Sequence, residues 1–145
     1  MTPAVGQGTI GGTLTADTIL GIADSPWTVT SQVTVPLGVT LTVEAGVRVE
    51  FADGTQVVVD EGKMVANGTD AAPVVFGRPD GATHTWDGFV FEDTLEENRL
   101  THFSMEYGDG GGHSIEVTRA RLTIQFGDWP TTEKTMIEMD EPSVI

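Results

Sequence analysis

The sequence predicts an all-β solenoid, in which very short strands wind as coils around one axis. From Val33 to Phe51 (VTVPLGVTLTVEAGVRVEF), Val, Leu or Phe stands at almost every second position and Thr, Glu or Arg between them. This two-residue period is typical of a strand with one buried face. The breaks at 36–38 and 44–46 are too short to carry a chain across a β-sandwich, so they indicate tight corners.

Similar strands recur at intervals in the low-to-mid twenties. Val57 follows Val33 after 24 residues, and Ile115 follows Phe89 after 26. Short strands at this spacing, with Gly, Asp and Asn at the corners, are typical of coils stacked along an axis. On periodicity alone, a β-sandwich with a turn about every 8–12 residues stays open as the alternative.

Four segments carry a family resemblance: GTLTADT through VEF (12–51), VANGTDAAPVVF (65–76), WDGFVFED (86–93) and LTHFSMEYGDGGG (100–112). Together they resemble the opening coils of right-handed parallel β-helix proteins of the pectate-lyase-like kind, which are secreted or surface proteins of bacteria. The resemblance implies a short right-handed parallel β-helix of about five coils and an extracellular or cell-surface location. It implies little about activity, because one fold serves many functions.

The chain of 145 residues fits one domain, for which we expect four consecutive segments: a lead-in (1–12), an N-terminal cap (13–30), the coils (31–126) and a C-terminal tail (127–145). In the cap, apolar residues would cover the open edge of the first coil; they are Ile19, Leu20, Ile22 and Trp27. The tail would either cover the last coil or be exchanged with a neighbouring copy.

The alternation predicts which side chains point into the coils. Burying one of them stabilises a fold by about 1.5–3 kcal/mol. The predicted inward residues are Val33, Val35, Leu41, Val43, Val47, Val49, Phe51, Val57, Val59, Val74, Phe76, Phe89, Phe91, Ile115, Val117, Leu122 and Ile124.

Composition excludes several function classes. The formal charge of −15 argues against nucleic acid, whose phosphates require Lys and Arg. There is no cysteine, so we expect neither disulfides nor thiolate metal sites. No apolar stretch is long enough to span a membrane. The first residues have no secretory signal pattern, so the extracellular location that the resemblance implies would require a signal outside this chain.

Two sets of side chains are candidates for ligand binding. Four acids crowd one loop and could bind Ca²⁺, which takes six to eight oxygen ligands, although a solvated acidic loop explains them more simply; they are Glu92, Asp93, Glu96 and Glu97. Three aromatic residues could form a surface on which sugars stack, although packing at a corner is the favoured role for the first of them; they are Trp86, Tyr107 and Trp129. No catalytic residues are predicted, and no cofactor other than calcium.

The tail contains an apolar set that we expect to be buried, either over the last coil of this chain or against another copy. The set consists of Met136, Ile137, Met139, Val144 and Ile145. An uncovered last coil would leave an exposed apolar face, which in proteins marks an interaction or aggregation site. We therefore predict a homo-oligomer or filament.

These observations favour a non-enzymatic extracellular module with a structural or adhesive role, which self-assembles by pairing strands at its ends or edges. The resemblance also supports a short chain without catalysis, because enzymes of that class have about twice as many coils. The alternative is a carbohydrate-binding or carbohydrate-active fragment of the lyase or hydrolase kind, with a glycan as its partner.

Overall fold

The computed structural model of the protein describes residues 8–141 and 143–145; the rest of the predicted lead-in lies outside the described residues. The described part is all-β apart from one short 3₁₀ helix, η1 (Ile22–Asp24). In that part, no helix has the length and apolar character needed to cross a membrane. The strands are β1 (Thr9–Thr13), β2 (Thr18–Leu20), β3 (Trp27–Val35), β4 (Thr40–Val43), β5 (Arg48–Phe51), β6 (Val57–Asp60), β7 (Lys63–Asn67), β8 (Val74–Gly77), β9 (Phe89–Glu92), β10 (Asn98–Met105), β11 (His113–Thr118), β12 (Leu122–Asp128) and β13 (Thr135–Asp140).

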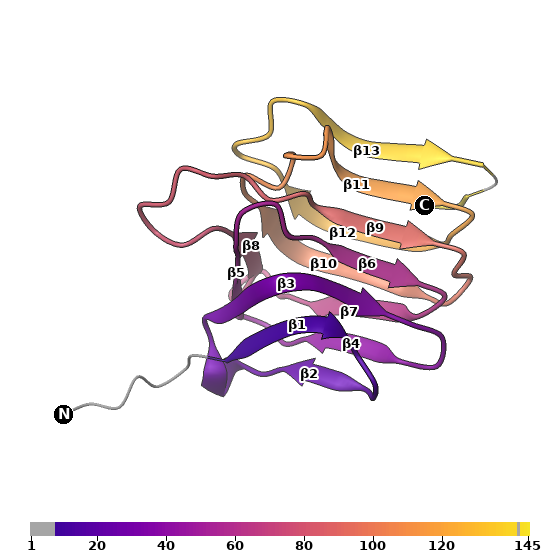
Figure 1. The fold of residues 1–145 in the computed structure, drawn as a ribbon, viewed down its shortest axis with the longest axis horizontal. Coiled ribbons are helices and arrows are strands. Elements are labelled where there is room, and N and C mark those ends of the chain that lie inside the picture. The colour runs from indigo at the N-terminus through magenta and orange to yellow at the C-terminus, as the bar shows by residue number, and fades with distance from the viewer. Residues whose placement is uncertain (1–7, 142) are drawn as a thin grey trace.

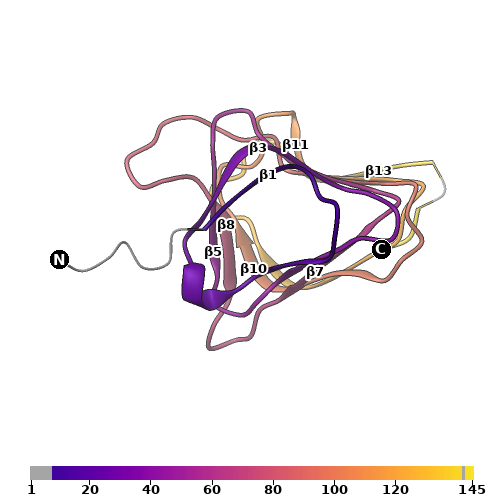
Figure 2. The ribbon, with the colours of Figure 1, turned by 60° about the horizontal axis from the view of Figure 1, so that its bottom comes forward.

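The strands pair in parallel within one 13-stranded sheet, which is wound into a solenoid of about five turns. Figure 1 shows these turns, here called coils, stacked from β1 and β2 at the N-terminal end to β13 at the C-terminal end. In Figure 2 the coils lie over one another around a common interior. The predicted all-β parallel solenoid of about five coils is confirmed.

Each coil contributes strands to three faces of the solenoid. Face A consists of residues 12–13 and 33–35, followed by β6, β9, β11 and β13. Face B consists of β2, β4, β7, residues 98–101 and residues 122–125. Face C consists of residues 9–10, residues 27–29, β5, β8, residues 103–105 and residues 127–128.

In-register pairing places like positions of successive coils on top of one another. One inward row of face A runs Val33, Val57, Phe89, Ile115 and Ile137. An inward row of face B runs Leu20, Val43, Ala66, Leu100 and Ile124. Because side chains of a strand alternate between its two sides, the intervening rows point to solvent.

The interior is filled by these inward rows. Every predicted inward residue is buried except Ile124, which is partly buried against the core. Aromatic rings fill the middle coils, where Phe76 and Phe89 meet edge to face with their centroids 4.8 Å apart. The predicted core is therefore confirmed, and its one weaker member lies in the last coil.

The corner between faces A and B repeats with a shared backbone conformation. Glu61, Asp93, Arg119 and Glu141 occupy it in successive coils, all with positive φ between 47° and 66°. The N–H of Glu61 donates to Glu92 O, and the N–H of Asp93 donates to Thr118 O. Non-glycine residues with positive φ are uncommon, so the stacking of the coils stabilises a turn that these residues rarely adopt alone.

The repeat extends further at both ends than residues 31–126. At the N-terminal end, β1 and β2 already pair with β3 and β4 as parallel strands. At the C-terminal end, the repeat predicted to stop after Phe126 continues, because β13 stacks in register on β11. Its inward positions, Ile137 and Met139, are separated from the preceding strand by Trp129 and Pro130, which hides the continuation in the sequence.

The predicted apolar cover of the N-terminal end is only partly present. Leu20 is buried and Trp27 packs against the core, whereas Ile19 and Ile22 are exposed. Leu20 points inward because β2 forms part of face B, and the neighbouring Ile19 then points outward. The segment is thus a first coil rather than a separate lid.

Candidate interaction surface at the C-terminal end

The predicted sugar-stacking residues lie in packed positions. Trp86 is fully buried, with 0% of its surface exposed, and its ring stacks on Phe51 with centroids 3.8 Å apart. The guanidinium of Arg78 lies 3.4 Å from the centroid of the Tyr107 ring and covers one of its faces. Trp129 packs edge to face against a buried phenylalanine. The Trp86 ring is therefore part of the core and offers no face to a sugar.

The four acids of the predicted calcium loop do not converge. Asp93 instead forms an ion pair with Arg119, and Glu97 lies 3.5 Å from Arg121. Among residues 8–141 and 143–145, no group of three or more His, Cys, Asp or Glu side chains could hold a metal ion. The loop at 93–97 is an acidic corner in which Asp93 and Glu97 interact with arginines of the following coil.

The predicted self-association set lies at the C-terminal end of the solenoid. Ile137 is partly buried, whereas the other four members are exposed, at 48–62% of their surface. These four side chains are therefore not buried within their own chain, although β13 itself stacks on β11. Burial against another copy stays a prediction.

Their exposure follows from the register. Val117 is fully buried because coils lie on both sides of it, whereas Met139, the next residue in the same inward row, is 48% exposed. Within the described chain, β13 pairs with β11 on one side and with no strand on the other. The C-terminal end thus combines half-exposed inward side chains with a free strand edge.

An exposed aromatic residue adds to this end. Phe126 is 73% exposed, and its ring stacks on that of His102 in the preceding coil, with centroids 4.3 Å apart and an angle of 11°. Both residues have positive φ at the corner between faces B and C. Phe126 lies outside the self-association set predicted from the sequence, because alternation alone places it with the inward residues of its strand.

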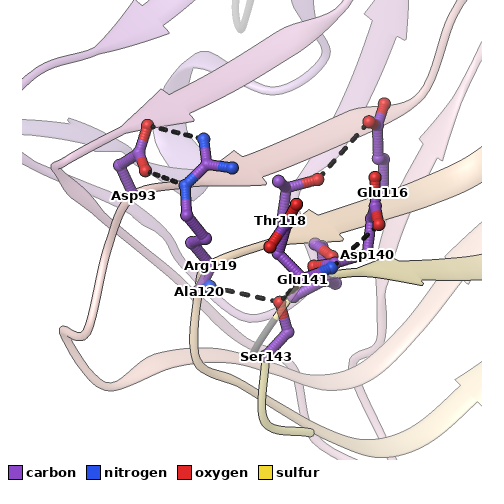
Figure 3. A network of polar contacts seen from close by, with 9 residues as sticks. Asp93, Glu116, Thr118, Arg119, Ala120, Asp140, Glu141 and Ser143 are labelled. Atoms are coloured by element: carbon purple, nitrogen blue, oxygen red, sulfur yellow. Dashed lines mark hydrogen bonds and ion pairs between the residues drawn. The ribbon is translucent and has the colours of Figure 1, made fainter.

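Polar contacts hold the last coil in place (Figure 3). The hydroxyl of Ser143 accepts from the Ala120 N–H at 3.3 Å and contacts Asp140 O at 2.9 Å. Val144 then forms a parallel bridge with Arg121, at the start of face B. The last residues are therefore attached to the solenoid although their apolar side chains are exposed.

A histidine links the two outermost strands of face A. His113 lies between two carboxylates, with Nε2 3.1 Å from Glu116 and Nδ1 3.2 Å from Glu138. Glu116 and Glu138 are in-register neighbours in one outward row. When His113 is protonated, it offsets the repulsion between these stacked carboxylates.

The A–B corner also alters carboxylate ionisation. The hydrogen bond from Arg119 to Asp93, 2.6 Å from Nε to Oδ1, lowers the pKa of Asp93. Burial raises the pKa of Glu92, and neighbouring acids, Asp60 first among them, raise it further. The negative charge of Glu92 is therefore unfavourable, because the carboxylates of Asp60, Asp93 and Glu116 lie close enough to repel it.

A buried asparagine that the sequence analysis missed joins three coils. Asn98 is buried on face B; its Oδ1 accepts from the Met64 N–H at 2.8 Å, and its Nδ2 donates to Arg121 O at 2.9 Å. These partners are 34 residues before it and 23 residues after it. Its position before an apolar strand in a polar loop (EENRL) offers no sign of these distant contacts.

The comparisons with known proteins returned no match of any kind. The chain fits no protein-family model, and no curated protein and no solved structure is detectably similar to it.

Proposed function

We propose that this protein is a non-enzymatic structural module that self-associates through the C-terminal end of its solenoid. The observation that carries the proposal is the set of half-exposed inward side chains on a strand with a free edge. Met139 and Ile137 continue rows that are buried from β3 to β11. A free strand edge is a template for pairing with another chain.

The physical gain from such association has two parts. Burying apolar surface contributes about 25 cal/mol per Å², so a half-exposed Met side chain at this end contributes on the order of 1 kcal/mol. Pairing of the β13 edge adds backbone hydrogen bonds and fixes the orientation of the partner. Together these make the C-terminal end a specific contact rather than a general adhesive patch.

An extracellular or surface location is part of the proposal. It is supported by the resemblance of the coils to secreted pectate-lyase-like solenoids and by the parallel solenoid itself. The charge of −15 favours solubility of a module exposed to solvent. In such a location, an adhesive or scaffolding role would depend on how copies are joined.

The test is the oligomeric state of the full chain and of a charged variant. Met139→Lys places a charge at the half-exposed end, where the long side chain can reach solvent without unfolding the strand. We expect the wild type to form higher species with rising concentration in size-exclusion chromatography with light scattering. Met139→Lys should remain monomeric, with an unchanged circular dichroism spectrum.

Leu37→Lys is the matched control. Leu37 is 72% exposed and lies at a corner away from the C-terminal end, so its replacement should leave association intact. A wild type that stays monomeric at all concentrations would contradict the proposal. Equal association of the wild type and Met139→Lys would show that another surface is responsible.

A further inference from the structure

We propose that the surface that binds the C-terminal end is the N-terminal end of a second copy, so that copies stack head to tail in one continuous solenoid. This inference rests on the proposed function and specifies its partner surface. It is carried by three properties of the two ends: the order of their faces, the register of their rows and the distribution of their charges.

The order of the faces matches at the two ends. The last coil crosses face C at Gly127 and Asp128 and face A along β13, and it reaches face B at Val144. The first coil begins on face C at Thr9, continues on face A at Gly12 and reaches face B along β2. A second copy placed above β13 therefore begins on the face where the next coil of the first copy would begin.

The register of the rows also continues from one copy to the next, with each residue on the same side of its face. The outward row of face A runs Thr13, Thr34, Val58, Val90, Glu116 and Glu138. Thr13 of a second copy, stacked on Glu138, extends this row as a further outward residue. On the inward row of the same face, Gly12 of the second copy falls above Ile137. On face B, β2 of the second copy comes above the layer of Val144. Inward positions thus meet inward positions, and outward positions remain outward.

The charges favour this pairing over a tail-to-tail one. Neither β1 (TIGGT) nor β2 (TIL) contains a charged residue or a Pro. Such residues are the usual protection of an edge strand against pairing. β13 contains Glu138 and Asp140. Two copies that met through β13 would bring these carboxylates close to one another, and like charges across a strand pair are destabilising. The uncharged strands β1 and β2 avoid this repulsion.

Engineered cysteines test the geometry directly, because the chain has none of its own. Parallel neighbours in adjacent strands lie about 4.8 Å apart, within the separation of about 4.4–6.8 Å that a disulfide requires between Cα atoms. We would mix Thr13→Cys with Glu138→Cys under mild oxidation and examine the products by non-reducing electrophoresis. Head-to-tail stacking predicts the mixed dimer, and the double variant should give a ladder of covalent oligomers.

Each single variant on its own reports an alternative geometry. Dimers of Glu138→Cys alone as the main product would indicate tail-to-tail contact, which overturns the inference but leaves the proposed function standing. Dimers of Thr13→Cys alone as the main product would indicate head-to-head contact, which overturns both. Val90→Cys replaces Glu138→Cys in the control mixture, because Val90 lies in the same outward row two coils away from the end. It should not cross-link to Thr13→Cys.

Salt and light scattering separate failure of this inference from failure of the proposed function. Association between copies of net charge −15 should strengthen as salt screens their repulsion, and the yield of the mixed dimer should rise with it. Absence of cross-links together with a monomeric wild type overturns both proposals. Association of the wild type without the mixed dimer overturns the head-to-tail geometry alone.

Discussion

Replacing Asn98 with alanine should loosen three coils at once. In the native protein, the side-chain carbonyl of Asn98 accepts a hydrogen bond from the Met64 N–H, and its amide donates to Arg121 O and, at 3.2 Å, to Glu96 O. Asn98 is 1% exposed, so water cannot readily replace these bonds. The variant leaves a buried N–H and at least one carbonyl without their partner.

The expected loss follows from the number of orphaned groups. A buried donor left without an acceptor costs about 1–3 kcal/mol, and a typical neutral hydrogen bond contributes about 0.5–1.5 kcal/mol. Asn98→Ala should therefore lower the free energy of unfolding by about 2–4 kcal/mol. This is a large share of the stability of a small domain, which is about 5–15 kcal/mol.

Urea denaturation followed by circular dichroism measures the change. Thr123→Ala, at an exposed outward position of the same face, is the control and should change the stability by less than about 0.5 kcal/mol. Asn98→Asp retains the acceptor for Met64 but requires a proton to donate to the carbonyls, so it should be less destabilising in acid than at neutral pH. A loss for Asn98→Ala no greater than that of the control would refute the reasoning.

Two further predictions concern the core residue Trp86 and the carboxylate of Glu92. Trp86→Ala should lower the free energy of unfolding by about 3–5 kcal/mol, because it removes a buried ring stacked on Phe51 and the hydrogen bond from Nε1 to Glu106 O; a loss below about 1 kcal/mol in denaturant titrations would contradict this. Glu92→Gln should raise the melting temperature at neutral pH. The pKa of Glu92 in the folded protein is raised above its ordinary value of 4.5. Protonated Glu92 therefore contributes its full stability below pH 4.5, and this contribution is lost as the pH rises through the raised pKa of the folded state. The advantage of Glu92→Gln should therefore grow as pH increases across this interval, and an advantage that does not change with pH would count against it.

Much of the fold could be predicted because its signals are local. Each inward residue of the middle coils, such as Val43 or Phe91, belongs to a short alternating strand, and alternation depends only on immediate neighbours along the chain. Recurrence of that alternation after roughly one coil length indicates stacking, and the family resemblance favoured this interpretation over a β-sandwich. Burial of Val43 and Phe91 in the structure agrees with that prediction.

The candidate interaction surface was predicted less completely. The apolar tail residues were identified from composition, but whether they cover the last coil depends on where β13 lies relative to β11. The loop at 129–134 conceals that register, so Met139 could not be recognised as the end of the row of Val117. Phe126 shows the same difficulty, because a turn with positive φ reverses the orientation that alternation assigns to it.

The sequence by itself determined that the chain is an all-β solenoid, which residues fill its interior, and that its tail carries apolar side chains. Only the tertiary structure decided which residues of different coils are neighbours: Asn98 with Met64 and Arg121, and Trp86 with Phe51. The physical reason is that the corners differ in length from coil to coil. Residue spacing along the chain therefore does not give the register between coils, which is set when the strands pair and the inward rows pack together.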